Sequence, residues 1–134
     1  MPVSKLILLV DDDPDDRMLF NEAFKQVNNG FELVELKNGE ELMQYLNNGQ
    51  PVPKLIVMDF HMELMSGEEI LMSIKNNKQL SRIPVIVYSG SSSCIQQDPI
   101  LKLGANAYVQ KPNTYEKMVD VVKSMMLLFA PAAN

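Results

Sequence analysis

Polar side chains that can bind cations or phosphate come directly after short apolar runs of this sequence. The runs are residues 6–10, 55–58, 85–87 and 107–109. The polar residues at or just beyond their ends are Asp11, Asp12, Asp13, Asp59, Ser89 and Lys111. If the runs are strands of an open parallel sheet, their carboxyl ends lie along one edge, where the ligand sites of such sheets form. We therefore predict one site that contains several carboxylates, a hydroxyl and an ammonium.

These residue types predict a particular chemistry. Crowded carboxylates repel one another unless a cation neutralises them. Carboxylate oxygens that are open to water suit Mg²⁺ (or Mn²⁺), which also bridges to phosphate oxygens. A lysine and a hydroxyl can neutralise and hydrogen-bond a transferring phosphoryl group, and a carboxylate can accept that group as an aspartyl-phosphate. The site therefore predicts a divalent cation and phosphoryl transfer onto an aspartate.

The elements that must position this site can be predicted from the spacing of apolar residues. Residues 6–10, 55–58 and 85–87 are apolar almost throughout, as in strands covered on both faces, whereas residues 31–36 alternate and predict a strand nearer an edge. The first predicted helix begins at Pro14, after an Asp13 N-cap. The other predicted helices are residues 40–46 (opened by Asn38 or Gly39), 67–77, 99–103 (capped by Asp98, with Pro99 in the first turn) and 115–129 (with Asn113 and Glu116 at capping-box spacing).

A strand followed by a helix, five times over, predicts an α/β fold with a parallel sheet between layers of helices. The chain of 134 residues has the length of one domain. We expect a single domain over residues 1–134, with its core at 4–129 and no output domain.

Composition excludes several classes of function. The net charge of −5 argues against a sequence-independent grip on nucleic acid and against binding to an anionic membrane surface. The sequence contains no secretory signal and no apolar stretch of the roughly 20 residues that span a bilayer. The single cysteine, Cys94, cannot form an internal disulfide, and we expect it in a loop without a redox role. We expect a soluble cytoplasmic protein.

The sequence resembles the receiver domains of two-component response regulators over essentially its whole length. The matching segments are residues 7–14, residues 55–59 with Met62 and Gly67, residues 84–90, and residues 104–112. The four segments occur in order, at the family's spacing, and each lies at a predicted strand end. The resemblance implies a flavodoxin-like, doubly wound (βα)5 fold with a five-stranded parallel sheet in the order 2-1-3-4-5.

The resemblance also implies which residues bind metal and phosphate. Asp59 matches the phosphoacceptor, which receives a phosphoryl group from the phosphohistidine of a histidine kinase. Asp11 and Asp12 match the acidic pair that holds Mg²⁺ together with Asp59. The residue two positions beyond the acceptor, here His61, gives the metal its backbone carbonyl in that family.

The remaining matches concern the switch that follows phosphorylation. Ser89 matches the hydroxyl residue that turns toward the phosphoryl oxygens, and Lys111 matches the lysine that pairs with them. Tyr108 matches the aromatic residue that swings inward when the hydroxyl moves, although a plain core role is an equal expectation. The Lys111–Pro112 peptide bond is usually cis in the family, so we expect a cis bond here.

Three positions depart from the family pattern. Glu63 stands where proline is common, His61 stands where asparagine or a similar residue is usual, and Asn113 replaces an apolar or aromatic residue. A lone histidine is a poor transition-metal ligand, so we expect the His61 imidazole to be a surface group. These departures affect the phosphoryl lifetime and the partner face rather than the central chemistry.

Acidic residues beside the site have a plainer interpretation. We expect Asp13, Asp15 and Asp16 to form the N-cap and a solvated first turn, stabilised by the helix dipole, rather than further ligands.

Three rival functions differ in testable ways. Asp11 and Asp13 have the spacing of the nucleophile motif in haloacid-dehalogenase-like phosphatases, but Asp15 stands where threonine or valine is usual. A flavodoxin-like cofactor carrier needs phosphate donors in its first loop, where three aspartates would repel a phosphate. A pseudo-receiver would bind partners without being phosphorylated, and the presence of the full set of site residues disfavours it. We expect a phosphoacceptor rather than a turnover enzyme.

The expected partners follow from the resemblance. They are a sensor histidine kinase or a phosphotransfer protein, and a downstream protein bound through the face of the fourth helix, the fifth strand and the fifth helix. The sequence leaves a homodimer open and names neither the kinase nor the downstream protein.

Overall fold

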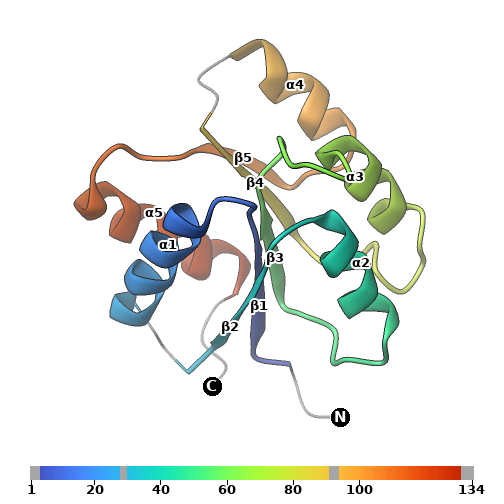
Figure 1. Cartoon of the computed structure of the whole chain (residues 1–134), viewed down its shortest axis with the longest axis horizontal. Helices are drawn as coiled ribbons and strands as arrows, with labels where there is room; N and C mark the ends of the chain where they lie inside the picture. Colours follow the sequence, from blue (N-terminus) through green and yellow to red (C-terminus); the bar gives the residue numbers. More distant parts are fainter. Residues whose placement is uncertain (1–3, 28–29, 91–93, 131–134) are drawn as a thin grey trace.

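Five strands alternate with five helices in the computed structural model, which describes residues 4–27, 30–90 and 94–130, without the side chains of residues 94–97 (Figure 1). The strands are β1 (Leu6–Val10), β2 (Glu32–Leu36), β3 (Leu55–Met58), β4 (Val85–Ser89) and β5 (Ala107–Gln110). The helices are α1 (Pro14–Val27), α2 (Gly39–Asn47), α3 (Gly67–Lys75), α4 (Cys94–Lys102) and α5 (Tyr115–Phe129).

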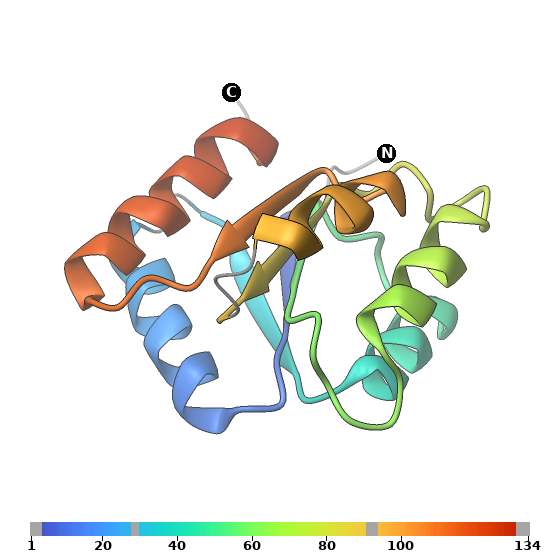
Figure 2. The ribbon, with the colours of Figure 1, turned by 90° about the horizontal axis from the view of Figure 1, so that it is seen from above.

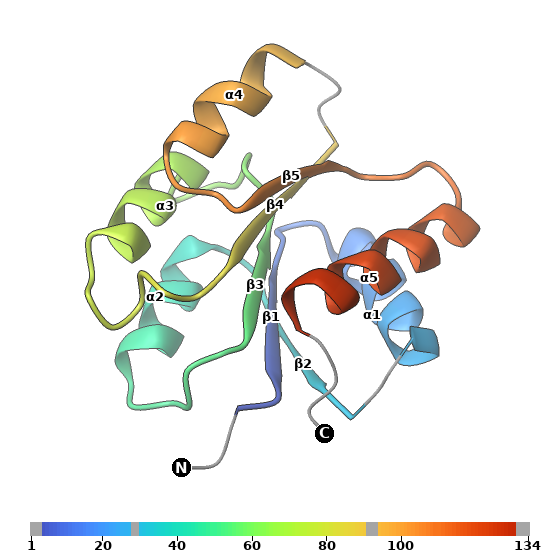
Figure 3. The ribbon, with the colours of Figure 1, turned by 180° about the vertical axis from the view of Figure 1, so that it is seen from behind.

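The strands form one parallel sheet in the order β2-β1-β3-β4-β5. Helices α1 and α5 cover one face, and α2, α3 and α4 lie on the other side, as Figures 2 and 3 show from two directions. Both the α/β class and the 2-1-3-4-5 order predicted from the sequence are confirmed. The alternating strand β2 is at an edge, as expected.

The continuous apolar runs are explained by two separate cores. Ile7 and Leu9 of β1 pack among residues of α1 and α5, whereas Leu8 and Val10 pack on the α2–α4 side. Successive side chains of a strand point to opposite faces, so a strand covered on both faces needs apolar residues at every position. The sheet is therefore held rigidly between two layers, with its carboxyl edge available for a site.

Helix starts agree with the predicted caps in two cases, α1 and α2, and differ in two, α4 and α5. Asp98, the cap predicted for the fourth helix, lies inside α4 instead of before its first turn. The Asp13 carboxylate accepts the backbone N–H of Asp15 at 2.9 Å, and Asn38 caps α2 through the N–H of Glu41 at 2.8 Å.

In α5 the N-cap is Thr114, whose hydroxyl accepts the Lys117 N–H at 3.2 Å, so the expectation of Asn113 was wrong. Thr114 is the flanking residue with extended backbone, which is what an N-cap requires.

Helix α4 is longer than predicted. It covers Cys94–Lys102, so Pro99 lies in its interior rather than in its first turn, and Cys94 begins a helix instead of lying in a loop. The interior proline removes only one helical hydrogen-bond donor, and its neighbours keep the helical conformation. Helix α3 is shorter than predicted and ends at Lys75, because the Asn77 side chain accepts the N–H groups of Gln79 and Leu80 and forms a turn.

None of the helices that the structure describes has the length and apolar character needed to cross a membrane.

Candidate functional site

The register of the sheet brings two of the aspartates to the same level. Val10 of β1 is paired with Met58 of β3, so Asp11 and Asp59 leave adjacent strands side by side. The Asp59 N–H donates to the Val10 carbonyl at 2.9 Å, and the Asp11 N–H donates to the Leu36 carbonyl at 3.1 Å. These bonds continue the ladders into the site, so the backbone of both aspartates is held as firmly as the strands.

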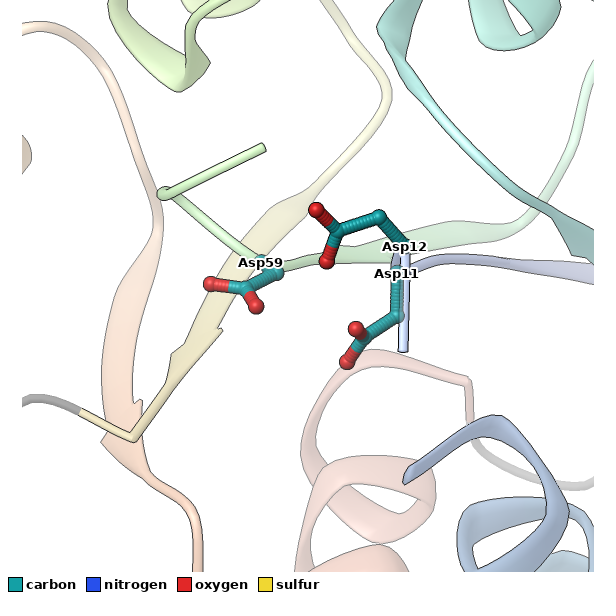
Figure 4. Close-up of side chains that lie close together, drawn as sticks. All are labelled: Asp11, Asp12 and Asp59. Carbon is teal, nitrogen blue, oxygen red and sulfur yellow. The ribbon is translucent and has the colours of Figure 1, made fainter. Parts of the chain in front are cut away.

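Three carboxylates converge at this edge. One carboxylate oxygen from each of Asp11, Asp12 and Asp59 lies within 4.8 Å of the other two, and Figure 4 shows the three side chains gathered at the ends of β1 and β3. Asp11 and Asp59 are buried, and Asp12 is exposed. Three hard oxygen donors with one side open to water fit Mg²⁺ or Mn²⁺, which keep several water ligands. The predicted acidic set is therefore brought together.

Lys111 enters the same cluster from the end of β5. Its ammonium nitrogen lies 2.8 Å from Asp11 Oδ2 and 3.2 Å from Asp59 Oδ2. Its backbone N–H donates to the Ser89 carbonyl at 2.8 Å, which continues the pairing of β4 with β5. Burial by itself would lower the pKa of Lys111, but its hydrogen bonds to Asp11 and Asp16 raise the pKa above the ordinary lysine value. The lysine is therefore a permanent cation at neutral pH.

Asp16 also binds Lys111, which the sequence interpretation missed. Asp16 Oδ2 lies 2.8 Å from the ammonium nitrogen, so its side chain pairs with the lysine instead of being only solvated. As expected, Asp16 lies in the first turn of α1 and is not among the carboxylates that could hold a metal ion. Asp13 is the N-cap and Asp15 is exposed, as expected. The one available signal was that Asp16 lies in the first turn of a helix that starts at the site, so its side chain can reach back to the sheet edge.

Asp11 is the most deeply placed acid of the cluster, with 1% of its surface exposed. Burial raises the pKa of its carboxyl group, while hydrogen bonds from Lys111 and from the Asp13 N–H (3.0 Å) oppose that rise. Because burial disfavours the charged form of this carboxylate, a further cation beside it would stabilise that charged form. The electrostatics of the site therefore agree with the metal-binding interpretation.

Ser89 and Tyr108 lie on the same face of the sheet. Ser89 is the buried last residue of β4, and Tyr108 of β5 is paired with Val87, two residues before Ser89. Alternation along the strand places Val87 and Ser89 on one face. Val87 and the half-buried Tyr108 both pack in the core on the α2–α4 side. The two predicted switch residues therefore share the layer that contains α4.

The His61 imidazole lies outside the carboxylate cluster. The side chain is exposed and contacts the Phe60 ring edge-on at 5.6 Å, while the His61 backbone N–H donates to Asp59 Oδ1 at 3.1 Å. The predicted surface position of the imidazole is confirmed.

The expected cis bond between Lys111 and Pro112 is wrong. The residues that the structure describes contain no cis peptide bond, so this bond is trans. A bond that precedes proline favours trans by ~0.5–1 kcal/mol unless neighbouring contacts select cis. Here the trans form is compatible with the Lys111 N–H bond to Ser89 and with the ammonium contacts.

Tyr88 lies under the lysine and was not predicted as part of the site. Its ring packs edge-on against Phe20 at 5.5 Å, and the Lys111 ammonium lies 5.8 Å from the ring centroid, within the range of a cation–π contact. The Tyr88 hydroxyl is buried and has no hydrogen-bond partner among the described residues. The aromatic ring thus supports Lys111 from the α1–α5 core.

Comparisons with known proteins agree with this geometry. The family model for the response regulator receiver domain matches residues 7–123. The response regulator Rcp1 of Synechocystis sp. is 33% identical over 134 residues, with 92% of this chain and 89% of Rcp1 covered. The crystal structure of the Mn²⁺-bound form of Rcp1 has a TM-score of 0.85 at 28% identity, covering 96% of each chain. That of the phosphorylated cyanobacterial phytochrome response regulator RcpA has a TM-score of 0.86 at 30% identity, covering 98% of each.

A parallel sheet of order 2-1-3-4-5, three converging aspartates and a paired lysine are thus found in a chain that the receiver model matches almost throughout. This chain belongs to the response regulator receiver domain family.

Proposed function

We propose that this protein accepts a phosphoryl group on Asp59 from the phosphohistidine of a sensor histidine kinase or a phosphotransfer protein. Response regulators are two-component partners of histidine kinases, and receiver domains are typically phosphoacceptors rather than turnover enzymes. They are generally cytoplasmic, and we expect the same location here. The observation that carries the proposal is the contact of the Lys111 ammonium with Asp59 Oδ2 at 3.2 Å, inside a cluster of carboxylates.

The chemistry needs little from the protein beyond position and charge. A carboxylate oxygen of Asp59 attacks the phosphorus, the phosphorus–nitrogen bond of the phosphohistidine breaks, and the electron pair returns to the imidazole, which takes a proton. Lys111 stabilises the charge on the phosphoryl oxygens. Asp11, Asp12, Asp59 and the backbone carbonyl of His61 would hold Mg²⁺ or Mn²⁺, which when bound neutralises charge between the carboxylates and the phosphoryl oxygens.

Two relatives support these assignments. Rcp1 has been crystallised in a Mn²⁺-bound form, and RcpA has been crystallised phosphorylated. The similarity of this chain to both proteins, at about 30% identity and over at least 96% of each chain, supports divalent-metal binding and phosphorylation here.

We propose that phosphorylation is transmitted through Ser89 and Tyr108. Ser89 would turn toward the phosphoryl oxygens. The half-buried Tyr108 would then move inward, into the space that the Ser89 side chain leaves. This would alter the surface of α4, β5 and α5, to which a downstream protein would bind. The support is that both residues face the α4 layer and lie two register positions apart at the sheet edge.

Labelling with a small phosphodonor tests the proposal. The wild-type chain is incubated with Mg²⁺ and acetyl phosphate, and intact mass and peptide mapping locate the added phosphoryl group. We expect one group on Asp59, none in Asp59→Asn, and wild-type labelling in Asp120→Asn, which changes an exposed aspartate of α5 by the same single charge. Chelation of the metal should abolish labelling.

The outcomes separate the rival functions. Labelling that survives Asp59→Asn would refute the acceptor assignment. A folded wild-type chain that takes up no phosphoryl group from acetyl phosphate or from a phosphorylated kinase domain would be a pseudo-receiver. Sustained hydrolysis of many equivalents of a phosphate ester would identify a phosphatase.

A further inference from the structure

We propose that Asp16 competes with the phosphoryl group for Lys111 and thereby limits how readily Asp59 is phosphorylated. Asp16 is a positioning residue in this proposal, because it acts only through the lysine. The inference rests on the proposed function of Asp59 and starts from the 2.8 Å contact between Asp16 Oδ2 and the Lys111 ammonium nitrogen.

All of the donor capacity of the lysine is in use. A lysine ammonium has three N–H donors. Three carboxylates lie within hydrogen-bond distance of the nitrogen: Asp11 at 2.8 Å, Asp16 at 2.8 Å and Asp59 at 3.2 Å. A phosphoryl oxygen can therefore accept a hydrogen bond from Lys111 only if the ammonium gives up or weakens one of these contacts.

Asp16 differs from the other two partners in what the reaction does to it. Asp59 becomes the acyl phosphate, and Asp11 belongs to the group of carboxylates that can hold a metal ion. Asp16 lies outside that group and comes from a different element, the first turn of α1. Its negative charge therefore remains directed at Lys111 after metal binding and phosphorylation, and it pulls the ammonium away from the phosphoryl oxygens.

The first turn of α1 is held in place, so Asp16 is presented in a defined position. The Asp13 carboxylate accepts the N–H groups of Asp15 and Asp16, and the guanidinium of Arg17 donates to the Asp11 carbonyl. The centroid of the Tyr88 ring lies 5.8 Å from the ammonium nitrogen. These contacts favour the lysine conformation that reaches Asp16.

The expected effect is moderate. The Asp16 side chain is about one-third exposed, at 32%, so solvent weakens its pairing with the lysine. Partly exposed ion pairs alter equilibria by about two- to fivefold, which sets the expected change in rate and affinity when Asp16 loses its charge.

The test compares two neighbouring substitutions that make the same change of charge. Asp16→Asn removes the competing carboxylate, whereas Asp15→Asn changes an exposed residue in the same helical turn that makes no ion pair with Lys111. With saturating Mg²⁺ and acetyl phosphate, we expect Asp16→Asn to be labelled about two- to fivefold faster than the wild type and Asp15→Asn to match it. Affinity for beryllium trifluoride, a phosphoryl mimic that binds without covalent transfer, should rise by the same factor.

A double-mutant cycle shows whether Asp16 acts through the lysine. In a Lys111→Met background, Asp16→Asn should change neither the labelling rate nor the affinity for beryllium trifluoride, which can be measured even where labelling is slow. An effect that persists without Lys111, or equal values for Asp16→Asn and Asp15→Asn, would overturn the competition. Failure of the wild-type chain to be labelled would instead overturn the proposed function.

Discussion

The Lys111 ammonium lies 5.8 Å from the centroid of the Tyr88 ring, so the cation of the acidic site rests on an aromatic side chain of the hydrophobic core. Tyr88 is 1% exposed and comes from β4, the strand next to the one that positions the lysine. Its buried hydroxyl has no hydrogen-bond partner among the described residues. The ring thus supports the site while its polar atom destabilises the fold.

Replacing Tyr88 with phenylalanine should stabilise the protein. The substitution keeps the ring beneath Lys111 and removes a buried hydroxyl that has no hydrogen-bond partner in the described part of the chain. The burial of such a group costs ~1–3 kcal/mol. We expect the free energy of unfolding in urea to rise by about 1 kcal/mol at pH 7. The matched control is Tyr115→Phe, which removes an exposed hydroxyl that donates to Gln26 and should change stability little. A loss of stability in Tyr88→Phe would show that the hydroxyl has a partner in solution.

The advantage of Tyr88→Phe should grow at alkaline pH. Burial raises the pKa of the Tyr88 phenol above its ordinary value near 10. Above pH 10 the unfolded chain releases this proton while the folded chain keeps it, so wild-type stability falls by about 1.4 kcal/mol per pH unit from this group. The phenylalanine variant lacks that loss. Urea unfolding of both proteins at pH 8 and pH 11 measures the difference. If the free energy of unfolding changes equally in the wild type and in Tyr88→Phe between these pH values, the raised pKa is contradicted.

Divalent cations should stabilise the folded chain independently of any phosphodonor. A ligand that binds only the folded chain adds ~2.7 kcal/mol to the free energy of unfolding at a hundredfold excess over its dissociation constant, and we expect a gain of this size for Mg²⁺ at the carboxylate cluster. Asp12→Asn should reduce this gain, and Asp15→Asn should retain it. The gain should shrink as pH falls, because Asp11, whose pKa burial raises, must be deprotonated to bind metal. The gain is measured as the increase in melting temperature that Mg²⁺ causes. Equal increases in Asp12→Asn and Asp15→Asn would place the ion elsewhere.

Gly67→Ala should disturb the loop that follows the acceptor. A methyl group at this position would lie 2.8 Å from the Phe60 carbonyl oxygen and 2.9 Å from its Cα, immediately after Asp59. The backbone must move to relieve this contact, so we expect a loss of ~1–3 kcal/mol in stability and slower labelling of Asp59. Gly90→Ala is the control for stability, since no atom of the described residues lies within 4 Å of its added methyl group. Unchanged urea unfolding in Gly67→Ala would contradict the close approach.

Thr114→Ala should destabilise α5, whereas Asn113→Ala should not. Thr114 accepts the Lys117 N–H through its hydroxyl, and loss of an N-cap costs ~1 kcal/mol. Urea unfolding of the two variants compares adjacent positions in the same loop. The reverse order of stabilities would restore Asn113 as the cap.

The sequence determined the fold class, the strand order through the family resemblance, and most of the acidic site. Asp11, Asp12, Asp59 and Lys111 could be assigned to one place because parallel strands end at a common edge, which requires only correct strand ends. The continuous apolar runs predicted those ends, since the sheet is covered on both faces. Small errors in helix boundaries had no effect on that inference.

The tertiary structure alone decided the contacts that depend on helix phase and docking distance. Whether Asp16 faces solvent or Lys111 depends on how the first turn of α1 is set against β5, which no local pattern encodes. That the buried Tyr88 hydroxyl has no hydrogen-bond partner among the described residues likewise results from packing between elements far apart in the sequence. Periodicity specifies the face of an element, but hydrogen bonds form or fail over a few tenths of an ångström, and only the packed molecule sets distances at that scale.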